Sequence, residues 1–356
     1  MRVIISAGGT GGHIYPALAI VNKIKEKDAN SEFLYIGTTD RMEKDIVPKQ
    51  NIPYFGIDIE GIKRKKIFSN VNVLKKYVIA KSSLKKVISE FNPDIVIGTG
   101  GYVTAPVIKC AKKLGYKTLV HEQNAVFGLT NKLLLKSTDV MCTSIKSDIS
   151  NSKIVFTGNP RSEEVSLVKS VSKSSLGFDS TLKLVVVVMG SLGSMSINTK
   201  LKEMIPFFSN KHYQVLVVTG KNYFDDFNDI SIPDNVKVVS YIDNFIGVMK
   251  SCDLLISRAG ATTISEITSI GVGSILVPSP YVTNNHQLKN AMALEEVGAC
   301  KIIEESDFSK DSVITCIDYI FDNKEEFDKM KEASLSLGVN DSATRIYEEI
   351  RKLLGD

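Results

Sequence analysis

Short apolar runs alternate with helical patterns along the whole chain, and this alternation limits the possible folds more than any other feature. The first half has six such runs, at residues 2–6, 33–37, 94–98, 117–121, 139–143 and 153–158. The second half repeats the order, with runs at 182–190, 214–220, 236–242, 253–257, 273–278 and 300–303. Strands that alternate with helices pair in parallel and are covered on both faces. We therefore predict an α/β fold of two doubly wound, Rossmann-like domains that face each other across a cleft.

The chain has 356 residues, which is long enough for two separate cores. The sequence SEEVSLVKSVSKSSLGFDS between the halves holds seven serines and little strand pattern. We predict an N-terminal domain over 1–161, a linker over 162–181 and a C-terminal domain over 182–340. The sequence DSATRIYEEIRKLL predicts a closing helix over 341–354, which one interpretation packs back onto the N-terminal domain.

Charge and cysteine content exclude several classes of protein. A net charge of +4 is too small to indicate a nucleic-acid partner, so we expect none. The five cysteines form no CxxC pair, which favours free thiols in a reducing compartment. We find no signal-peptide pattern at the N-terminus and no apolar run of membrane-spanning length. The expected location is the cytosol or the cytosolic side of a membrane.

The sequence SAGGTGGHIYPA, residues 6–17, places a glycine-rich turn between the first strand and a helix. It lacks the Lys-Ser or Lys-Thr of an ATP-binding P-loop, and it breaks the dinucleotide pattern because Ile14 stands where the last glycine belongs. Backbone N–H groups at a helix N-terminus suit a phosphate or a sugar oxygen. His13 lies in the first turn, where the helix dipole disfavours protonation, so it suits a proton acceptor. The alternative is a histidine that only caps the turn.

A second glycine turn, GTGGYVTAP at 98–106, follows the third apolar run and is expected at the same sheet edge. Two adjacent glycine turns offer enough backbone donors for a diphosphate, although glycines also simply allow close packing. In HEQN, residues 121–124, we expect Glu122 and Asn124 to bind sugar hydroxyls and His121 to be structural. Arg161 in TGNPR ends the last strand of this half and can reach the cleft.

Three loops of the second half carry polar groups. MGSLGS offers Ser191 at a helix N-terminus, which is an anion-binding geometry. In ISRAGATTISE, Glu266 can accept two ribose hydroxyls, although a glutamate near a helix N-terminus is commonly only a dipole partner. NNHQLKNA places an amide group, that of Gln287, at the start of a further helix.

Taken in order, the motifs GGTGGH, GTGGYV, HEQN, GNPR, GSLG, SRAGATTISE and HQLKNA resemble the MurG family of GT-B glycosyltransferases over nearly the whole chain. The resemblance implies transfer of N-acetylglucosamine from UDP-N-acetylglucosamine to the 4-hydroxyl of N-acetylmuramic acid in lipid I, the undecaprenyl-pyrophosphoryl-MurNAc-pentapeptide. The product would be lipid II. It also implies inversion of configuration, no cofactor or obligatory metal, and peripheral attachment to the cytoplasmic face of the cell membrane.

The resemblance further implies a role for each matching residue. His13 is the candidate general base. Acceptor binding falls to Gly100, Gly101 and Tyr102. Binding of the UDP-N-acetylglucosamine donor falls to Thr10, Gly11, Gly12, Asn124, Arg161, Ser191, Ile242, Ala261, Thr262, Thr263, Ser265, Glu266 and Gln287. Many relatives carry GGSQGA where this chain has MGSLGS, so a contact made by that glutamine would be lost at Leu192.

A basic stretch lies between Gly61 and Ser89, with nine lysines or arginines and no acidic residue. Apolar side chains alternate with the charges, which suits docking to anionic membrane lipids. The candidate docking residues are Lys63, Arg64, Lys65, Lys66, Ile67 and Phe68. A solvated loop is the other interpretation. The family resemblance also admits other cell-wall synthesis proteins as partners.

Two further classes of function stay open at this point. Another GT-B enzyme, such as a glycolipid glycosyltransferase or a UDP-sugar epimerase, would use the same fold and donor. A catalytically silent UDP-sugar-binding protein would need neither His13 nor an acceptor. Measuring turnover separates the silent protein from the enzymes, and the product formed from the donor alone separates the epimerase from the transferases.

Overall fold

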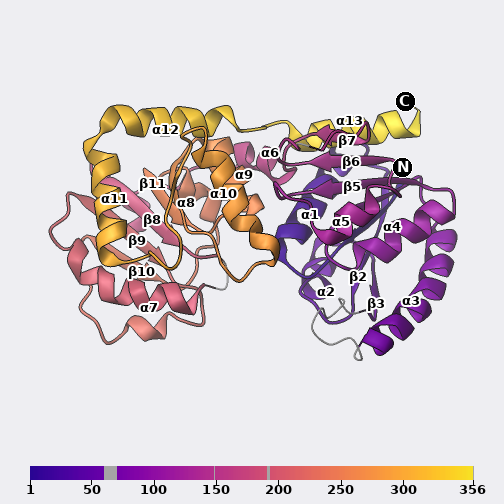
Figure 1. The fold of residues 1–356 in the computed structure, drawn as a ribbon, viewed down its shortest axis with the longest axis horizontal. Coiled ribbons are helices and arrows are strands. Elements are labelled where there is room, and N and C mark those ends of the chain that lie inside the picture. Colours follow the sequence, from indigo (N-terminus) through magenta and orange to yellow (C-terminus); the bar gives the residue numbers. More distant parts are fainter. Residues whose placement is uncertain (60–69, 148, 191–192, 356) are drawn as a thin grey trace. The chain divides into compact units, whose positions relative to one another are not determined.

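The computed structural model describes residues 1–59, 70–147, 149–190 and 193–355. The chain divides into two compact units, each shown in Figure 1. Unit 1 comprises Met1–Glu163 together with Asp341–Asp356, and unit 2 comprises Glu164–Asn340. The predicted linker 162–181 contains most of helix α6 (Arg161–Leu167) and a short 3₁₀ helix, Ser174–Leu176. An ion pair of 2.7 Å between Lys173 and Asp253 fastens this segment, most of which belongs to unit 2, to the rest of that unit.

Within the described residues, unit 1 contains a parallel sheet of seven strands in the order β3-β2-β1-β4-β5-β6-β7. The strands are β1 (Arg2–Ala7), β2 (Glu32–Thr38), β3 (Tyr54–Ile57), β4 (Ile95–Gly100), β5 (Lys117–Glu122), β6 (Val140–Thr143) and β7 (Ile154–Phe156). The helices are α1 (Gly11–Lys27), α2 (Glu43–Ile46), α3 (Asn70–Phe91), α4 (Thr104–Lys113), α5 (Leu129–Leu134) and α13 (Ser342–Leu354), with the start of α6. The edge strand β3 is the one strand of this sheet that the sequence pattern does not predict.

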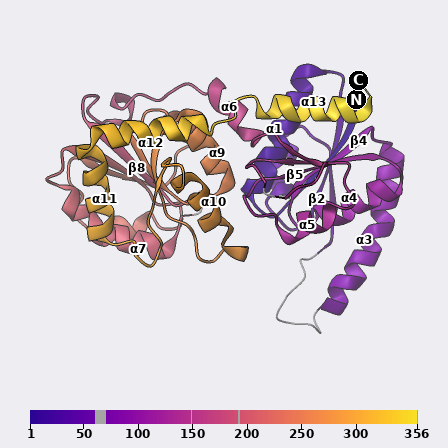
Figure 2. The same ribbon diagram turned by 45° about the horizontal axis from the view of Figure 1, so that its top comes forward.

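The C-terminal helix α13 belongs to unit 1. Its apolar face places Ile346 and Ile350, both fully buried, in the same core cluster as α1 and β1. The two views in Figures 1 and 2 show α13 lying beside α1. The carboxylate of Glu163 holds the junction, since it accepts hydrogen bonds from Thr344 N and Oγ1 and pairs with Lys23 at 2.8 Å.

Unit 2, over its described residues, contains a parallel sheet of six strands in the order β10-β9-β8-β11-β12-β13. The strands are β8 (Lys183–Val188), β9 (Tyr213–Val218), β10 (Val236–Val239), β11 (Leu254–Ser257), β12 (Gly273–Leu276) and β13 (Lys301–Ile302). The helices are α7 (Met195–Met204), α8 (Phe245–Met249), α9 (Ala261–Ile270), α10 (His286–Glu295), α11 (Lys310–Asp322) and α12 (Lys324–Ser336). The predicted pair of parallel α/β domains is confirmed.

Strand order fixes where a ligand can bind in each unit. The chain reverses direction across the sheet between β1 and β4 in unit 1 and between β8 and β11 in unit 2. Ligands of doubly wound sheets bind at the carboxyl ends of the strands beside such a switch point. The glycine turn at residues 8–10, the turn that begins at Gly101, and Gly190 each follow a strand of a switch-point pair.

All five cysteines are free, and Cys110, Cys142, Cys252 and Cys300 are buried. Burial raises the pKa of the Cys300 thiol to about 12, so this group stays protonated. None of the described helices is both long enough and apolar enough to cross a bilayer.

Candidate active site

The two glycine turns of unit 1 touch each other. Gly8 N–H donates a hydrogen bond of 3.2 Å to Gly100 O. Gly101 has φ of +84°, and a Cβ atom there would lie 2.3 Å from Gly8 O, closer than any side chain can approach. Only glycine at this position lets the loop after β4 lie against the loop after β1. The structure therefore brings Gly100 and Gly101 beside the turn that leads into α1.

His13 is the third residue of α1 and packs against the second glycine turn. A Cβ atom on Gly100 would lie 2.5 Å from His13 Cδ2, so the absence of a side chain makes room for the imidazole. His13 Nδ1 is 3.1 Å from Gly8 O, and Thr99 Oγ1 donates to His13 O at 2.8 Å. Because a carbonyl oxygen can only accept, this hydrogen bond places the proton on Nδ1. Nε2 is then the basic nitrogen of the ring.

The N-terminus of α1 supplies the other predicted groups of this loop. Thr10 is the N-cap residue, and its carbonyl accepts from His13 N at 3.0 Å and from Ile14 N at 3.2 Å. Gly11 and Gly12 form the first turn of this 17-residue helix. The backbone N–H groups at the start of α1 point out of the helix at the positive end of its dipole. A sugar oxygen or a phosphate is favoured at this position.

Glu122 has a different role from the sugar binding that its position at a strand end predicts. Its side chain is 2% exposed and holds the following loop. It accepts hydrogen bonds from Asn124 N and Nδ2, from Gly128 N and from Asn131 Nδ2, at 2.8–3.1 Å. Asn124, a predicted donor-binding residue, is therefore oriented by Glu122 through its own amide.

His121 is buried and structural, as expected. Its Nε2 donates to Gly158 O at 3.0 Å, and its Nδ1 accepts from Gln123 Nε2 at 3.0 Å. Burial lowers the pKa of His121 to about 4, so the ring is neutral near pH 7. The tautomer is the opposite of the one at His13.

Two other predicted site residues of unit 1 are Arg161, which lies near α1, and Tyr102, which lies in the second glycine turn. The guanidinium of Arg161 is 5.8 Å from the ring centre of Tyr15, which itself follows the glycine turn in α1. Arg161 N donates to Asn159 Oδ1 at 3.1 Å, so GNPR forms a tight turn into α6. Tyr102 follows Gly101 and is half-buried.

In unit 2 the turn from β8 to α7 has two glycines with positive φ, +86° at Gly190 and +74° at Gly193. Ser191, the predicted phosphate contact, lies outside the described residues, as do the candidate docking residues 63–68. Met189 is buried in the core of the unit. Ser194 is the N-cap residue of α7.

Helix α9 begins directly after Gly260 and carries the other candidates for the donor. Ala261, Thr262 and Thr263 form its first turn, and Ser265 Oγ donates back to Thr262 O at 2.7 Å. Glu266 lies in the second turn and is only 9% exposed. Ile242 lies in the loop after β10, half-buried. Gln287, in α10, accepts a hydrogen bond of 2.9 Å from Ser279 N and so holds the loop after β12.

Sequence reasoning missed a buried ion pair in unit 2. Arg258 Nη2 is 2.5 Å from Glu305 Oε2, with the side chains 11% and 8% exposed. Arg258 also donates to Ser194 Oγ at 2.9 Å and to Val277 O at 3.2 Å. Arg258 stands inside the SRAG motif and could have been found, whereas no sequence motif marks Glu305.

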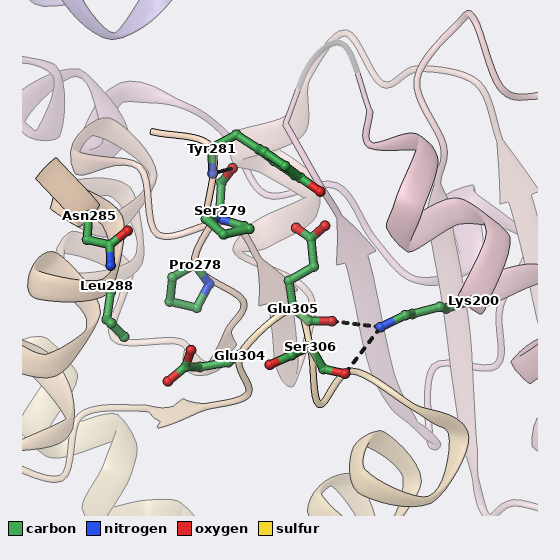
Figure 3. A pocket seen from close by; sticks show the side chains of 10 residues that line it. Lys200, Pro278, Ser279, Tyr281, Asn285, Leu288, Glu304, Glu305 and Ser306 are labelled. Carbon is green, nitrogen blue, oxygen red and sulfur yellow. Dashed lines mark hydrogen bonds between the residues drawn. The ribbon is translucent and has the colours of Figure 1, made fainter. Parts of the chain in front are cut away.

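A cavity of about 330 Å³ lies beside this ion pair. Figure 3 shows Lys200 donating to the backbone carbonyls of Glu305 and Ser306, with Tyr281 and Ser279 on the opposite wall. The ion pair and Lys200 together tie the loops after β8, β11, β12 and β13. Over the part of the chain described, no group of three His, Cys, Asp or Glu residues is arranged to hold a metal ion.

Known proteins share both halves of this architecture. Residues 3–142 match the glycosyltransferase family 28 N-terminal domain, and residues 184–346 match the family 28 C-terminal domain. A Bacillus cytotoxicus protein is 44% identical over 362 residues, which cover 99% of this chain and 100% of that protein. It is named UDP-N-acetylglucosamine--N-acetylmuramyl-(pentapeptide) pyrophosphoryl-undecaprenol N-acetylglucosamine transferase. The crystal structure of Acinetobacter baumannii MurG superposes with a TM-score of 0.80 at 27% identity over 99% of both chains.

The chain belongs to the MurG family. It is a hexosyltransferase with the GT-B fold, as the motifs predict. A UDP-N-acetylglucosamine 2-epimerase from Listeria monocytogenes has a TM-score of 0.73 at 15% identity, which shows the fold alone. The MurG assignment therefore decides between the transferase and the epimerase that the fold by itself leaves open.

Because the two glycine turns touch, we expect alanine to lower the free energy of unfolding more at Gly101 than at a glycine of similar φ that has open space around it. Gly101→Ala and Gly115→Ala both force alanine into the left-handed region, at φ of +84° and +90°, and this conformation costs about 1–2 kcal/mol. A Cβ at Gly115 has no described atom within 4 Å, whereas at Gly101 it meets Gly8 O. Urea unfolding should show a loss about 1–3 kcal/mol larger for Gly101→Ala. Equal losses would mean that the loop after β4 simply moves aside.

His121 predicts an acid-dependent loss of stability. Its folded-state pKa of about 4 lies below that of the unfolded chain, so the unfolded state takes up the proton first as the pH falls. The free energy of unfolding should fall by about 1.4 kcal/mol per pH unit between about pH 6.5 and pH 4 from this group alone. Urea titrations at several pH values should show a shallower slope in His121→Gln. The control, His212→Gln, removes an exposed histidine and should keep the wild-type slope.

Proposed function

We propose that this chain transfers N-acetylglucosamine from UDP-N-acetylglucosamine to the 4-hydroxyl of the N-acetylmuramyl residue of lipid I, which yields lipid II. Full-length identity of 44% to a transferase named for this reaction supports the assignment. The observation that carries the chemistry is the hydrogen bond between His13 Nδ1 and Gly8 O, because it leaves Nε2 as a base at a helix N-terminus.

The reaction is a single displacement with inversion. His13 Nε2 takes the proton of the acceptor hydroxyl while that oxygen forms a bond to the anomeric carbon of the donor sugar. The bond from the anomeric carbon to the β-phosphate oxygen breaks, and UDP leaves with the electron pair. Thr10, Gly11 and Gly12 lie at the α1 N-terminus beside His13, and Gly100, Gly101 and Tyr102 line the adjoining turn that would receive the acceptor diphosphate.

The donor-binding groups lie at the carboxyl edge of unit 2. The N-termini of α7 and α9 offer backbone donors to the leaving diphosphate, as does Ser191. Glu266 would accept the ribose hydroxyls, Ile242 would meet the uracil, and Gln287 would bind the sugar hydroxyls. The family resemblance also assigns donor binding to Asn124 and Arg161 of unit 1.

Peripheral attachment to the cytoplasmic face of the membrane fits the lipid-linked acceptor. The nine basic residues between Gly61 and Ser89, undiluted by acidic ones, support docking to anionic headgroups. The charges would bring the N-terminal domain to the surface that holds lipid I.

Turnover with labelled donor and lipid I in detergent tests the assigned reaction. His13→Ala should lower kcat by about 10²–10⁴-fold, because it removes the base, and should leave UDP binding intact. Calorimetry with UDP measures the second quantity, and His212→Ala, at an exposed histidine of unit 2, is the control. Equal losses of UDP binding and turnover would make His13 structural. Conversion of the donor without lipid I would replace the transferase by an epimerase.

Vesicle sedimentation tests the docking proposal. Replacing Lys63, Arg64, Lys65 and Lys66 by Gln should weaken binding to phosphatidylglycerol vesicles by about 1 kcal/mol per residue, and binding of the wild type should fall with added salt. The matched control replaces Lys310, Lys324, Lys329 and Lys331, which are exposed lysines of unit 2, and removes the same charge. If both sets weaken binding equally, net charge and not this segment attracts the membrane.

A further inference from the structure

A carboxylate with no role in the proposed reaction lies directly behind the first glycine turn. Glu43, the first residue of α2, is 0% exposed. Its Oε2 accepts from Gly9 N at 3.0 Å, and its Oε1 accepts from Thr38 N at 3.1 Å and from Thr38 Oγ1 at 2.7 Å. Ionised carboxylates are costly to bury even when hydrogen-bonded, and among the described residues Glu43 forms no ion pair. The burial of this carboxylate therefore needs a structural or functional explanation.

Two glycines leave space for this carboxylate, one on each of two sides. A Cβ atom on Gly8 would lie 2.6 Å from Glu43 Oε1, and one on Gly37 would lie 2.8 Å from Glu43 Cγ. Tyr35 and Tyr54 stack nearby, and their hydroxyls donate to Ala7 O and Thr38 O. Burial, with the Glu43 carboxylate, raises the pKa of Tyr35 well above its usual range, so it stays a neutral donor. Glu43 thus lies among closely packed groups.

One peptide group connects Glu43 to His13. Gly9 N–H and Gly8 C=O belong to the same peptide bond, which is trans, so the two groups point in opposite directions. Glu43 Oε2 accepts from the N–H on one side, and His13 Nδ1 is 3.1 Å from the carbonyl oxygen on the other. Fixing the N–H therefore also fixes the carbonyl that meets the imidazole. Gly9, at φ of +91°, lets the chain turn between the two.

We propose that Glu43 is a positioning residue for His13 and acts through the Gly8–Gly9 peptide. Its carboxylate holds the plane of this peptide so that Gly8 O faces Nδ1, which keeps the proton on Nδ1 and the lone pair on Nε2. A hydrogen bond from the N–H to a carboxylate also polarises the carbonyl, so the bond to the imidazole is stronger. The relevance of this arrangement to catalysis rests on the proposed role of His13 as the base.

Glu43→Gln tests the proposal with little change in shape. Glutamine has one oxygen and one NH₂ group, so either Gly9 N–H or Thr38 N–H would face another donor. We expect kcat to fall by about 10- to 100-fold, as for other residues that orient a functional histidine. KM for UDP-N-acetylglucosamine should change less than kcat, because the hydrogen bonds of Glu43 are to Gly9 and Thr38 and to none of the residues assigned to the donor.

The tautomer of His13 gives a readout that a merely structural role would not move. The chain has four histidines, so long-range ¹H–¹⁵N spectra of histidine-labelled protein are simple, and His13→Gln assigns the signal. In the wild type we expect Nδ1–H at His13 and, as an internal reference, Nε2–H at His121. In Glu43→Gln the His13 signal should shift toward the Nε2–H form, while His121 should not change.

Thr38→Val is the matched control. It removes the hydrogen bond from Thr38 Oγ1 to Glu43 and keeps the one from Gly9, so the His13 tautomer and kcat should both be retained. An unchanged tautomer in Glu43→Gln, or an equal shift in Thr38→Val, overturns the proposal. If Glu43→Gln does not fold, the wild-type spectrum decides, since Nε2–H at His13 contradicts the geometry and Nδ1–H supports it.

These spectra need no substrate, so the two proposals fail separately. If no variant transfers sugar to lipid I but the tautomer responds to Glu43→Gln, the assigned reaction is wrong and the positioning of His13 by Glu43 stands. If transfer occurs and the tautomer does not respond, the reaction stands and Glu43 only braces the loop.

Discussion

Two loops of unit 1 approach so closely that their backbones touch, and the geometry around His13 depends on this contact. Parallel strands β1 and β4 pair directly, with Val3 opposite Ile95, and their loops leave the sheet side by side. Glycine at position 101 allows the backbone of one loop to lie on Gly8 of the other. The imidazole then occupies the space above Gly100, where any side chain would displace it. The order of the strands therefore determines how the two loops pack, and the packing of the loops determines where the imidazole of His13 lies.

In unit 2 an ion pair holds the loops together, whereas in unit 1 the loops are in contact through glycines. Arg258 pairs with Glu305 largely shielded from water, and both also bind the start of α7, through Ser194 and Ser196 respectively. Removing one partner of such a pair leaves a buried charge, at a cost of about 3–5 kcal/mol. The loops that would surround a leaving diphosphate are thus held by a group that tolerates no simple substitution.

An element or site could be predicted from the sequence where neighbouring residues alone determine it, and could not where it depends on residues far away in the chain. Apolar periodicity is local, so most strands, their order of appearance and the glycine turns could be predicted from the sequence. β3 could not, because Tyr54–Ile57 is a four-residue edge strand that is mostly half-buried. Glu43 lies in TTDRMEKDI, which has the composition of a solvent-exposed helix; its burial depends on β2 and on the glycines that face it. Motif order carried the family assignment, whereas Glu122 shows that polarity at a strand end does not separate a ligand-binding group from a loop-holding one.

Buried or partly buried carboxylates recur at the places where this fold leaves regular structure. A loop that departs from a strand has N–H groups without ladder partners, and a carboxylate offers two oxygens that can accept several of them. Glu43 does this for the first glycine turn, Glu122 for the loop after β5, and Glu163 for the return of α13 onto α1. Each accepts at least one backbone N–H, so each fixes a peptide plane as well as a position. A carbonyl on that same plane is oriented at no further conformational cost, and at Gly8 the group it faces is an imidazole that needs one particular tautomer to act as a base.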